Sequence, residues 1–157
     1  MIKYVNTMVT FSEVPDEISL CIEISNCPCH CKNCHSSYLA QDIGTELTFN
    51  EVRKLIKKNS GVSCIALMGG DAEPDKINTL ASFIINHYNS IKVAWYSGRQ
   101  ELSNHIDLCN FDYIKLGPYK EEFGPLNSRT TNQRFYKVNG KELVDITSKF
   151  WKHETEN

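Results

Sequence analysis

The chain has 157 residues, of which 41% are hydrophobic and 23% charged, and its formal net charge is −2. These values fit one ordinary globular domain over residues 1–157, and the lack of a basic surplus argues against a nucleic-acid partner. No apolar run approaches the ~20 residues that a membrane-spanning helix needs, and residues 1–10 lack the pattern of a secretion signal. We therefore expect a cytoplasmic protein without membrane attachment, whose seven cysteines serve metal binding or catalysis instead of disulfides.

Strands and helices are predicted to alternate along the chain. Residues 18–25 alternate apolar and polar side chains, which is typical of a strand. Thr48 and Glu51 form a capping-box pattern at the start of a helix, and Pro74 opens a second helix. Apolar runs predict further strands at 63–68, 91–96 and 113–116, and a weaker helical pattern covers 100–108. The end of the chain, within 134–151, is predicted to form a strand pair or a strand followed by a helix.

This alternation predicts an α/β fold built from parallel strands. Right-handed crossovers place the carboxyl ends of such strands at one edge of the sheet, where binding sites gather. Four loops directly follow predicted strands: the cysteine segment 26–35, Gly69-Gly70-Asp71, Ser97-Gly98 and Gly117-Pro118. We expect these loops to converge on one site.

Four cysteines lie within eight residues, in the segment Cys27-Pro28-Cys29-His30-Cys31-Lys32-Asn33-Cys34-His35. Core packing does not explain them, because a lysine, an asparagine and two histidines lie among them. Zinc would use Cys31-x2-Cys34 together with further ligands. An iron–sulfur cube would use Cys27, Cys31 and Cys34 at three corners and leave its fourth iron open to a ligand. The spacing by itself leaves both metals open.

A family resemblance follows from this segment and four others. Cys27-x3-Cys31-x2-Cys34 after a first strand is similar to the signature of radical S-adenosylmethionine enzymes. Gly69-Gly70-Asp71 resembles their Gly-Gly-acid turn, and Trp95-Tyr96-Ser97-Gly98 resembles a strand end of the small activating enzymes. Residues 112–119 and 128–134 resemble two later segments of those enzymes. Together, over roughly 18–149, they resemble the activating proteins of anaerobic (class III) ribonucleotide reductases.

The chain departs from that family pattern at three places. Asn33 stands where many radical enzymes have an aromatic residue, and His35 is the ring available nearby. Ala72 and Glu73 separate the acid of the glycine turn from Pro74. Cys29 is an additional thiol inside the cysteine segment.

The resemblance implies a particular fold and set of ligands. The fold would be an incomplete parallel (βα) barrel of about five or six units, since a full eight-unit barrel needs ~250 residues. A [4Fe–4S] cluster would be bound by Cys27, Cys31 and Cys34. S-adenosylmethionine would be contacted by Asn33, His35, Gly69, Gly70, Asp71, Ser97 and Lys115. The cofactors would carry the chemistry, so no catalytic side chain is expected.

The implied activity is the reductive cleavage of S-adenosylmethionine to a 5′-deoxyadenosyl radical. That radical would generate a glycyl radical on the catalytic subunit of an anaerobic ribonucleotide reductase, with a small flavodoxin or ferredoxin as electron donor. Two other functions stay open. One is a minimal radical enzyme acting on a small molecule, similar to carboxy-deazaguanine synthase. The other is a zinc-binding interaction module without catalysis.

Overall fold

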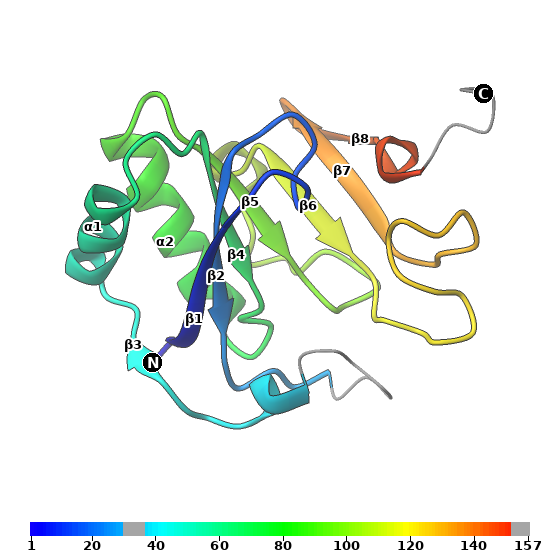
Figure 1. The fold of residues 1–157 in the computed structure, drawn as a ribbon, viewed down its shortest axis with the longest axis horizontal. Helices are drawn as coiled ribbons and strands as arrows, with labels where there is room; N and C mark the ends of the chain where they lie inside the picture. Colours follow the sequence, from blue (N-terminus) through cyan, green and yellow to red (C-terminus); the bar gives the residue numbers. More distant parts are fainter. Residues whose placement is uncertain (30–36, 152–157) are drawn as a thin grey trace.

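The computed structural model describes residues 1–29 and 37–151 (Figure 1). Within these residues, one mixed sheet has the strand order β3-β1-β2-β4-β5-β6-β7-β8. The strands are β1 (Lys3–Thr10), β2 (Ser19–Ile24), β3 (Thr45–Glu46), β4 (Cys64–Met68), β5 (Lys92–Tyr96), β6 (Tyr113–Leu116), β7 (Arg134–Asn139) and β8 (Glu142–Asp145). The expected α/β class is therefore confirmed.

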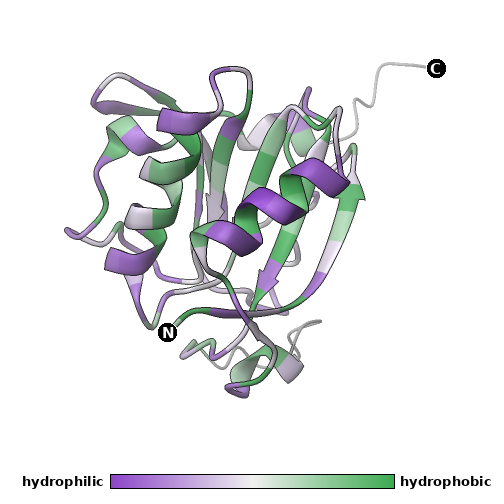
Figure 2. Ribbon diagram, turned by 90° about the vertical axis from the view of Figure 1, so that its left-hand side faces the viewer, coloured by the Kyte–Doolittle hydropathy of each residue, from purple (hydrophilic) through white to green (hydrophobic). Residues whose placement is uncertain are grey.

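The parallel part of the sheet consists of β2, β4, β5 and β6. Helix α1 (Phe49–Lys58) connects β2 to β4, and helix α2 (Pro74–His87) connects β4 to β5. Both helices cover the same face of the sheet, as the side view shows (Figure 2). Their apolar side chains pack there against alternate strand residues such as Leu20, Ile65 and Val93, each almost fully buried. This layer is the larger of the two cores.

The sequence signals at the helix starts correspond to real caps. The Thr48 hydroxyl accepts a hydrogen bond from the Glu51 amide at 3.1 Å, as the capping-box pattern predicts. The Glu51 carboxylate instead accepts a hydrogen bond from the Tyr4 hydroxyl at 2.6 Å, which ties α1 to β1. Pro74 lies at the first position of α2, where its missing amide hydrogen has no consequence.

The opposite face of the sheet is covered without an α-helix in the described part of the chain. Its core contains Cys21, Cys64, Ala66, Tyr96, Tyr113 and Phe135, with Leu126, Ile146 and Phe150 packed against them. The covering residues come from loops and from the 3-10 helix η3 (Thr147–Phe150). Asp145 begins this last turn: its carboxylate accepts hydrogen bonds from the Thr147 amide and hydroxyl and from Arg134 Nε. Although partial burial opposes them, these bonds lower the pKa of Asp145 below its usual value.

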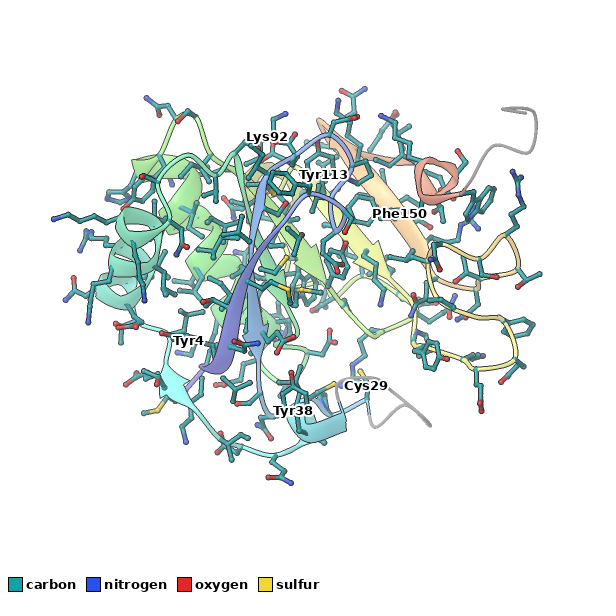
Figure 3. All side chains as sticks on the ribbon, in the orientation of Figure 1. Tyr4, Cys29, Tyr38, Lys92, Tyr113 and Phe150 are labelled. Carbon is teal, nitrogen blue, oxygen red and sulfur yellow. The ribbon has the colours of Figure 1, made fainter. Side chains whose placement is uncertain are left out.

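A buried carboxylate binds residues at the amino-terminal ends of three parallel strands. Glu17, only 8% exposed, accepts hydrogen bonds from Ser63 Oγ at 2.9 Å, Lys92 Nζ at 3.0 Å and the Tyr113 hydroxyl at 3.0 Å. Ser63, Lys92 and Tyr113 stand at or just before the starts of β4, β5 and β6. Lys92 and Tyr113 are labelled at this end of the sheet in Figure 3. The cluster aligns the three strand starts.

Four features differ from the sequence-based expectation. The parallel units are fewer than five or six, because β1, β3, β7 and β8 pair antiparallel at the two sides of the sheet. No pairing joins β3 to β8 among the described residues, so this sheet does not close into a barrel. The predicted helix at 100–108 is wrong: Ser103 and Asp107 side chains accept hydrogen bonds from nearby amides there, and only the 3-10 turn η2 (Leu108–Asn110) forms. The β1 and β3 strands were not predicted.

No helix in the part of the chain that the structure describes is long and apolar enough to cross a membrane.

Candidate functional site

The predicted site residues that the structure describes lie at the carboxyl edge of the four parallel strands. The strand register aligns Glu23, Met68, Tyr96 and Lys115 across β2, β4, β5 and β6. Cys27, Asp71 and Ser97 each follow this row within a few residues of their strand end. The expected convergence of loops is therefore present for all predicted site residues that the structure describes.

Hydrogen bonds to residues 39–41 hold the first two residues of the cysteine segment in place. The Asn26 amide donates to the Gln41 carbonyl at 2.9 Å and the Cys27 amide donates to the Leu39 carbonyl at 2.7 Å. The Tyr38 hydroxyl also donates to the Glu23 carboxylate, which links this part of the chain to β2. Backbone bonds on both sides of the segment thus fix where Cys27 leaves the sheet. The predicted site residues Cys31, Asn33, Cys34 and His35 lie outside the described residues.

Asp71 is the centre of the described site. The residue is 7% exposed, and one of its carboxylate oxygens accepts a hydrogen bond from Ser97 Oγ at 2.5 Å. The other oxygen accepts from the Gly98 amide at 2.8 Å and from the Cys29 thiol at 3.6 Å. The structure therefore joins three of the converging loops through one carboxylate.

Cys27 and Cys29 are both half-buried at this edge. A hydrogen bond with Cys27, burial, and the nearby Asp71 charge all raise the pKa of the Cys29 thiol. Cys29 also contacts Gly98 closely, because a Cβ atom added to Gly98 would lie 2.8 Å from Cys29 Sγ. Figure 3 labels Cys29 at the lower end of the sheet. Cys29, which the motif spacing omits, is thus packed into the site.

The glycine turn after β4 directs Asp71 toward β5. Gly69 and Gly70 have φ values of 115° and 90°, which favour glycine. A Cβ atom on Gly69 would lie 2.9 Å from the Ile24 carbonyl oxygen, and one on Gly70 would overlap the Ile77 side chain. The turn is also tied to β5, since Trp95 Nε1 donates to the Gly69 carbonyl at 2.7 Å. Both glycines are therefore required by packing inside the chain, whatever ligand the turn receives.

Lys115 lies near the carboxyl end of β6, in register with Tyr96 at the end of β5. It is 8% exposed, and its Nζ donates to the carbonyl oxygens of Ser97 at 3.1 Å and Gly117 at 2.9 Å. Ser97 therefore contacts two charged residues of the site, Asp71 through its hydroxyl and Lys115 through its carbonyl. The sequence placed Lys115 here, but its bonds to two carbonyls depend on the tertiary fold.

A hollow of about 500 Å³ adjoins Asp71. Its lining is Asp71, Pro74, Arg99, Gln100, Glu101 and Ser103. Sequence reasoning missed Arg99, although it directly follows the Ser97-Gly98 turn, which was a usable signal. Its amide donates to Ser97 Oγ at 3.1 Å. A buried carboxylate beside a hollow that also carries a guanidinium suits a small ligand with both an ammonium and an acidic group.

The donor set of this edge fits a thiophilic metal. Cys27 is one of three predicted ligands, and it lies beside a second thiol at the end of a parallel strand. Within residues 1–29 and 37–151, no three histidine, cysteine or acidic side chains form a metal site by themselves. A complete site would therefore need ligands from the cysteine segment outside the described residues, where the predicted ligands Cys31 and Cys34 lie.

Comparison with known proteins assigns no family. No protein-family model, curated protein or solved structure matches the chain. A functional assignment therefore depends on its own residues.

Proposed function

We propose that this chain is a radical S-adenosylmethionine enzyme that activates an anaerobic ribonucleotide reductase. The observation that supports it is the Asp71 cluster: the acid of the Gly-Gly-acid turn contacts Ser97, Gly98 and Cys29. In the resembling family, the same motif positions serve one cofactor site.

The residues have separate roles in this proposal. Cys27, Cys31 and Cys34 would hold a [4Fe–4S] cluster. That cluster would supply the one-electron reduction that cleaves a carbon–sulfur bond of S-adenosylmethionine, chemistry that would lead to removal of a hydrogen atom from a glycine of the reductase. Asp71 attracts the ammonium group of the cofactor, because a buried carboxylate makes strong charge-assisted hydrogen bonds. Ser97 fixes the orientation of that carboxylate, and Lys115 contributes a positive charge for the cofactor carboxylate. Gly69, Gly70, Asn33 and His35 complete the proposed contacts.

The sheet supports access by a macromolecular substrate. Four parallel strands carry the site, and the described strands do not close around it. We interpret this as the incomplete barrel of a radical S-adenosylmethionine enzyme, open enough to admit a glycine loop of the reductase catalytic subunit. A small flavodoxin or ferredoxin would supply the electron, and the setting would be the cytoplasm.

The test begins with metal content. Anaerobically reconstituted protein should contain about four iron and four sulfide per chain, as a cubane requires. Cys27→Ala should lose them, whereas Cys109→Ala, at an exposed cysteine in the turn η2 before the amino end of β6, should keep them. Stoichiometric zinc without iron would identify the interaction module instead.

Activity separates the two enzymatic alternatives. With dithionite and S-adenosylmethionine, the loaded protein should release 5′-deoxyadenosine, and the reductase subunit should gain a glycyl radical visible by electron paramagnetic resonance. Release of 5′-deoxyadenosine without any radical on the reductase would favour a small-molecule substrate.

A further inference from the structure

Cys29 has no role in the proposed function, although its thiol lies beside Cys27. Both residues are half-buried, so that each is partly open to solvent. The Cys29 thiol also forms a hydrogen bond with Cys27. The two sulfurs are therefore neighbours in space, and small molecules in solution can reach them.

The spacing of the two cysteines suits a disulfide. Residues two positions apart are separated by at most about 7 Å in an extended chain, and a disulfide usually joins Cα atoms that lie roughly 4.4–6.8 Å apart. Pro28 stands between the cysteines, and its ring fixes one of the backbone angles that could carry the two sulfurs apart. A bond between them therefore needs only a small adjustment of the backbone.

Both cysteines are anchored from outside the segment. The Cys27 amide donates to the Leu39 carbonyl at 2.7 Å. The Cys29 thiol donates to Asp71 Oδ2 at 3.6 Å, and its sulfur lies so close to Gly98 that an added Cβ atom would be 2.8 Å from it. Two groups that are held side by side react with each other much faster than two groups that must meet by diffusion. The anchoring therefore favours reaction within the pair.

The other described cysteines lack either access to solvent or a neighbouring accessible thiol. Cys21 and Cys64 are 2% and 0% exposed. Cys109 is exposed, but its thiol contacts Asn110. Among residues 1–29 and 37–151, Cys27 and Cys29 are thus the one pair of adjacent thiols that a small oxidant can reach.

We propose that Cys27 and Cys29 form a reversible disulfide, which withdraws Cys27 from metal binding under oxidising conditions. The oxidant is a small disulfide such as oxidised glutathione. One protein sulfur attacks it: a protein–glutathione S–S bond forms, the glutathione S–S bond breaks, and reduced glutathione leaves with the proton. The second protein sulfur then displaces the remaining glutathione, which takes up the second proton. Two protein thiols are oxidised, and one glutathione disulfide is reduced to two thiols.

The pairing itself does not depend on the proposed function, whereas its consequence does. A metal binds the thiolate of cysteine, so a Cys27 sulfur held in a disulfide could serve neither iron nor zinc. Disulfides in the cytoplasm are usually transient and often sense the redox state. The pair would thus allow metal loading only while the chain is reduced.

The test is mass spectrometry of reduced, chelator-treated protein after exposure to oxidised glutathione. In the wild-type chain, Cys27 and Cys29 should lose two hydrogens together and retain no glutathione. Cys29→Ser can still donate to Asp71 but cannot displace glutathione, so Cys27 should retain a mixed disulfide in that variant. Cys109 should carry one glutathione in both proteins, which makes it the internal control.

Dithiothreitol should restore the two thiols and, with them, the iron uptake that the oxidised wild-type chain has lost. Three results would each overturn the proposal: Cys27 or Cys29 bonded to another cysteine, both thiols unmodified while Cys109 reacts, or no retained glutathione on Cys27 in Cys29→Ser. Full iron uptake by a chain with an intact Cys27–Cys29 disulfide would instead count against Cys27 as a metal ligand, and so against the proposed function.

Discussion

Replacing Asp71 by asparagine tests the centre of the candidate site. The amide keeps the shape of the carboxylate but has one acceptor oxygen instead of two. The Ser97 hydroxyl and the Gly98 amide both donate to Asp71, at 2.5 and 2.8 Å. Ser97 Oγ already accepts from the Arg99 amide, so it is poorly placed to accept from the new amide group as well. One buried donor is therefore left without its acceptor.

An unsatisfied buried polar group costs about 1–3 kcal/mol. Asp71 is 7% exposed, so solvent screening gives little relief. We expect Asp71→Asn to lower the free energy of unfolding by about 2 kcal/mol, which shifts a urea midpoint by roughly 1 M. Glu101→Gln is the matched control, because Glu101 lines the same hollow but is exposed. It should stay within about 0.5 kcal/mol of the wild type.

The same variant has a binding readout under the proposed function. Loss of a charge-assisted contact worth about 1.5–3 kcal/mol should weaken S-adenosylmethionine binding by tenfold or more in equilibrium dialysis of cluster-loaded protein. Equal urea midpoints for Asp71→Asn and Glu101→Gln would refute the hydrogen-bond reasoning. Unchanged affinity in a destabilised Asp71→Asn protein would instead remove Asp71 from the ligand site.

Three further predictions concern other residues. Glu17→Gln should destabilise the fold by about 2 kcal/mol in urea titration, because one amide oxygen cannot serve three donors; a change below about 0.5 kcal/mol would contradict this. Asp145 has a pKa below its usual value of 3.8, so its contribution to stability should be complete near neutral pH and be lost in acid, as pH falls below that value and through the lowered pKa. Asp145→Asn should therefore converge on wild-type stability in acid, and a constant difference between neutral and acid pH would show the reasoning wrong. Cys31→Ala should abolish iron and sulfide incorporation while Cys29→Ala retains it; equal loss in both variants would refute the three-cysteine assignment.

Buried parallel strands were predictable from the sequence. The expected strands at 63–68, 91–96 and 113–116 correspond closely to β4, β5 and β6, because strands covered on both faces form short apolar runs. Their order along the chain also predicted which loops meet at the carboxyl edge. The approach of Asp71 to Ser97 follows from that topology, although the hydrogen bond itself does not.

Features that depend on long-range contacts were not predictable. Polar and apolar residues do not alternate clearly along strand β1, because side chains on both of its faces are partly exposed. The irregular register at Val5 disturbs the pattern further. Glu17 accepts from residues 46, 75 and 96 positions away, and no local pattern marks such a cluster. The predicted helix at 100–108 does not form because the Ser103 and Asp107 side chains bind nearby backbone amides. Serine and aspartate commonly do this, so the residue types gave a signal against the helix.

Gly98 links the described cysteine to the carboxylate, and its replacement should show how tightly they are held. An added Cβ would lie 2.8 Å from Cys29 Sγ and 3.6 Å from Asp71 Oδ2. Gly98 does not lie in the left-handed region, so backbone strain contributes nothing. The steric conflict is therefore with the Cys29 sulfur.

We expect Gly98→Ala to destabilise the protein by about 1 kcal/mol, at the low end for overpacking, because half-buried Cys29 can shift. Cys29→Ala removes the sulfur and should relieve most of that effect in the double variant, with a coupling energy of about 1 kcal/mol in urea titrations. Strictly additive effects would mean that Cys29 does not fill the space between Gly98 and Asp71. A clear coupling would show that Cys29 already packs against Gly98 before any metal is added.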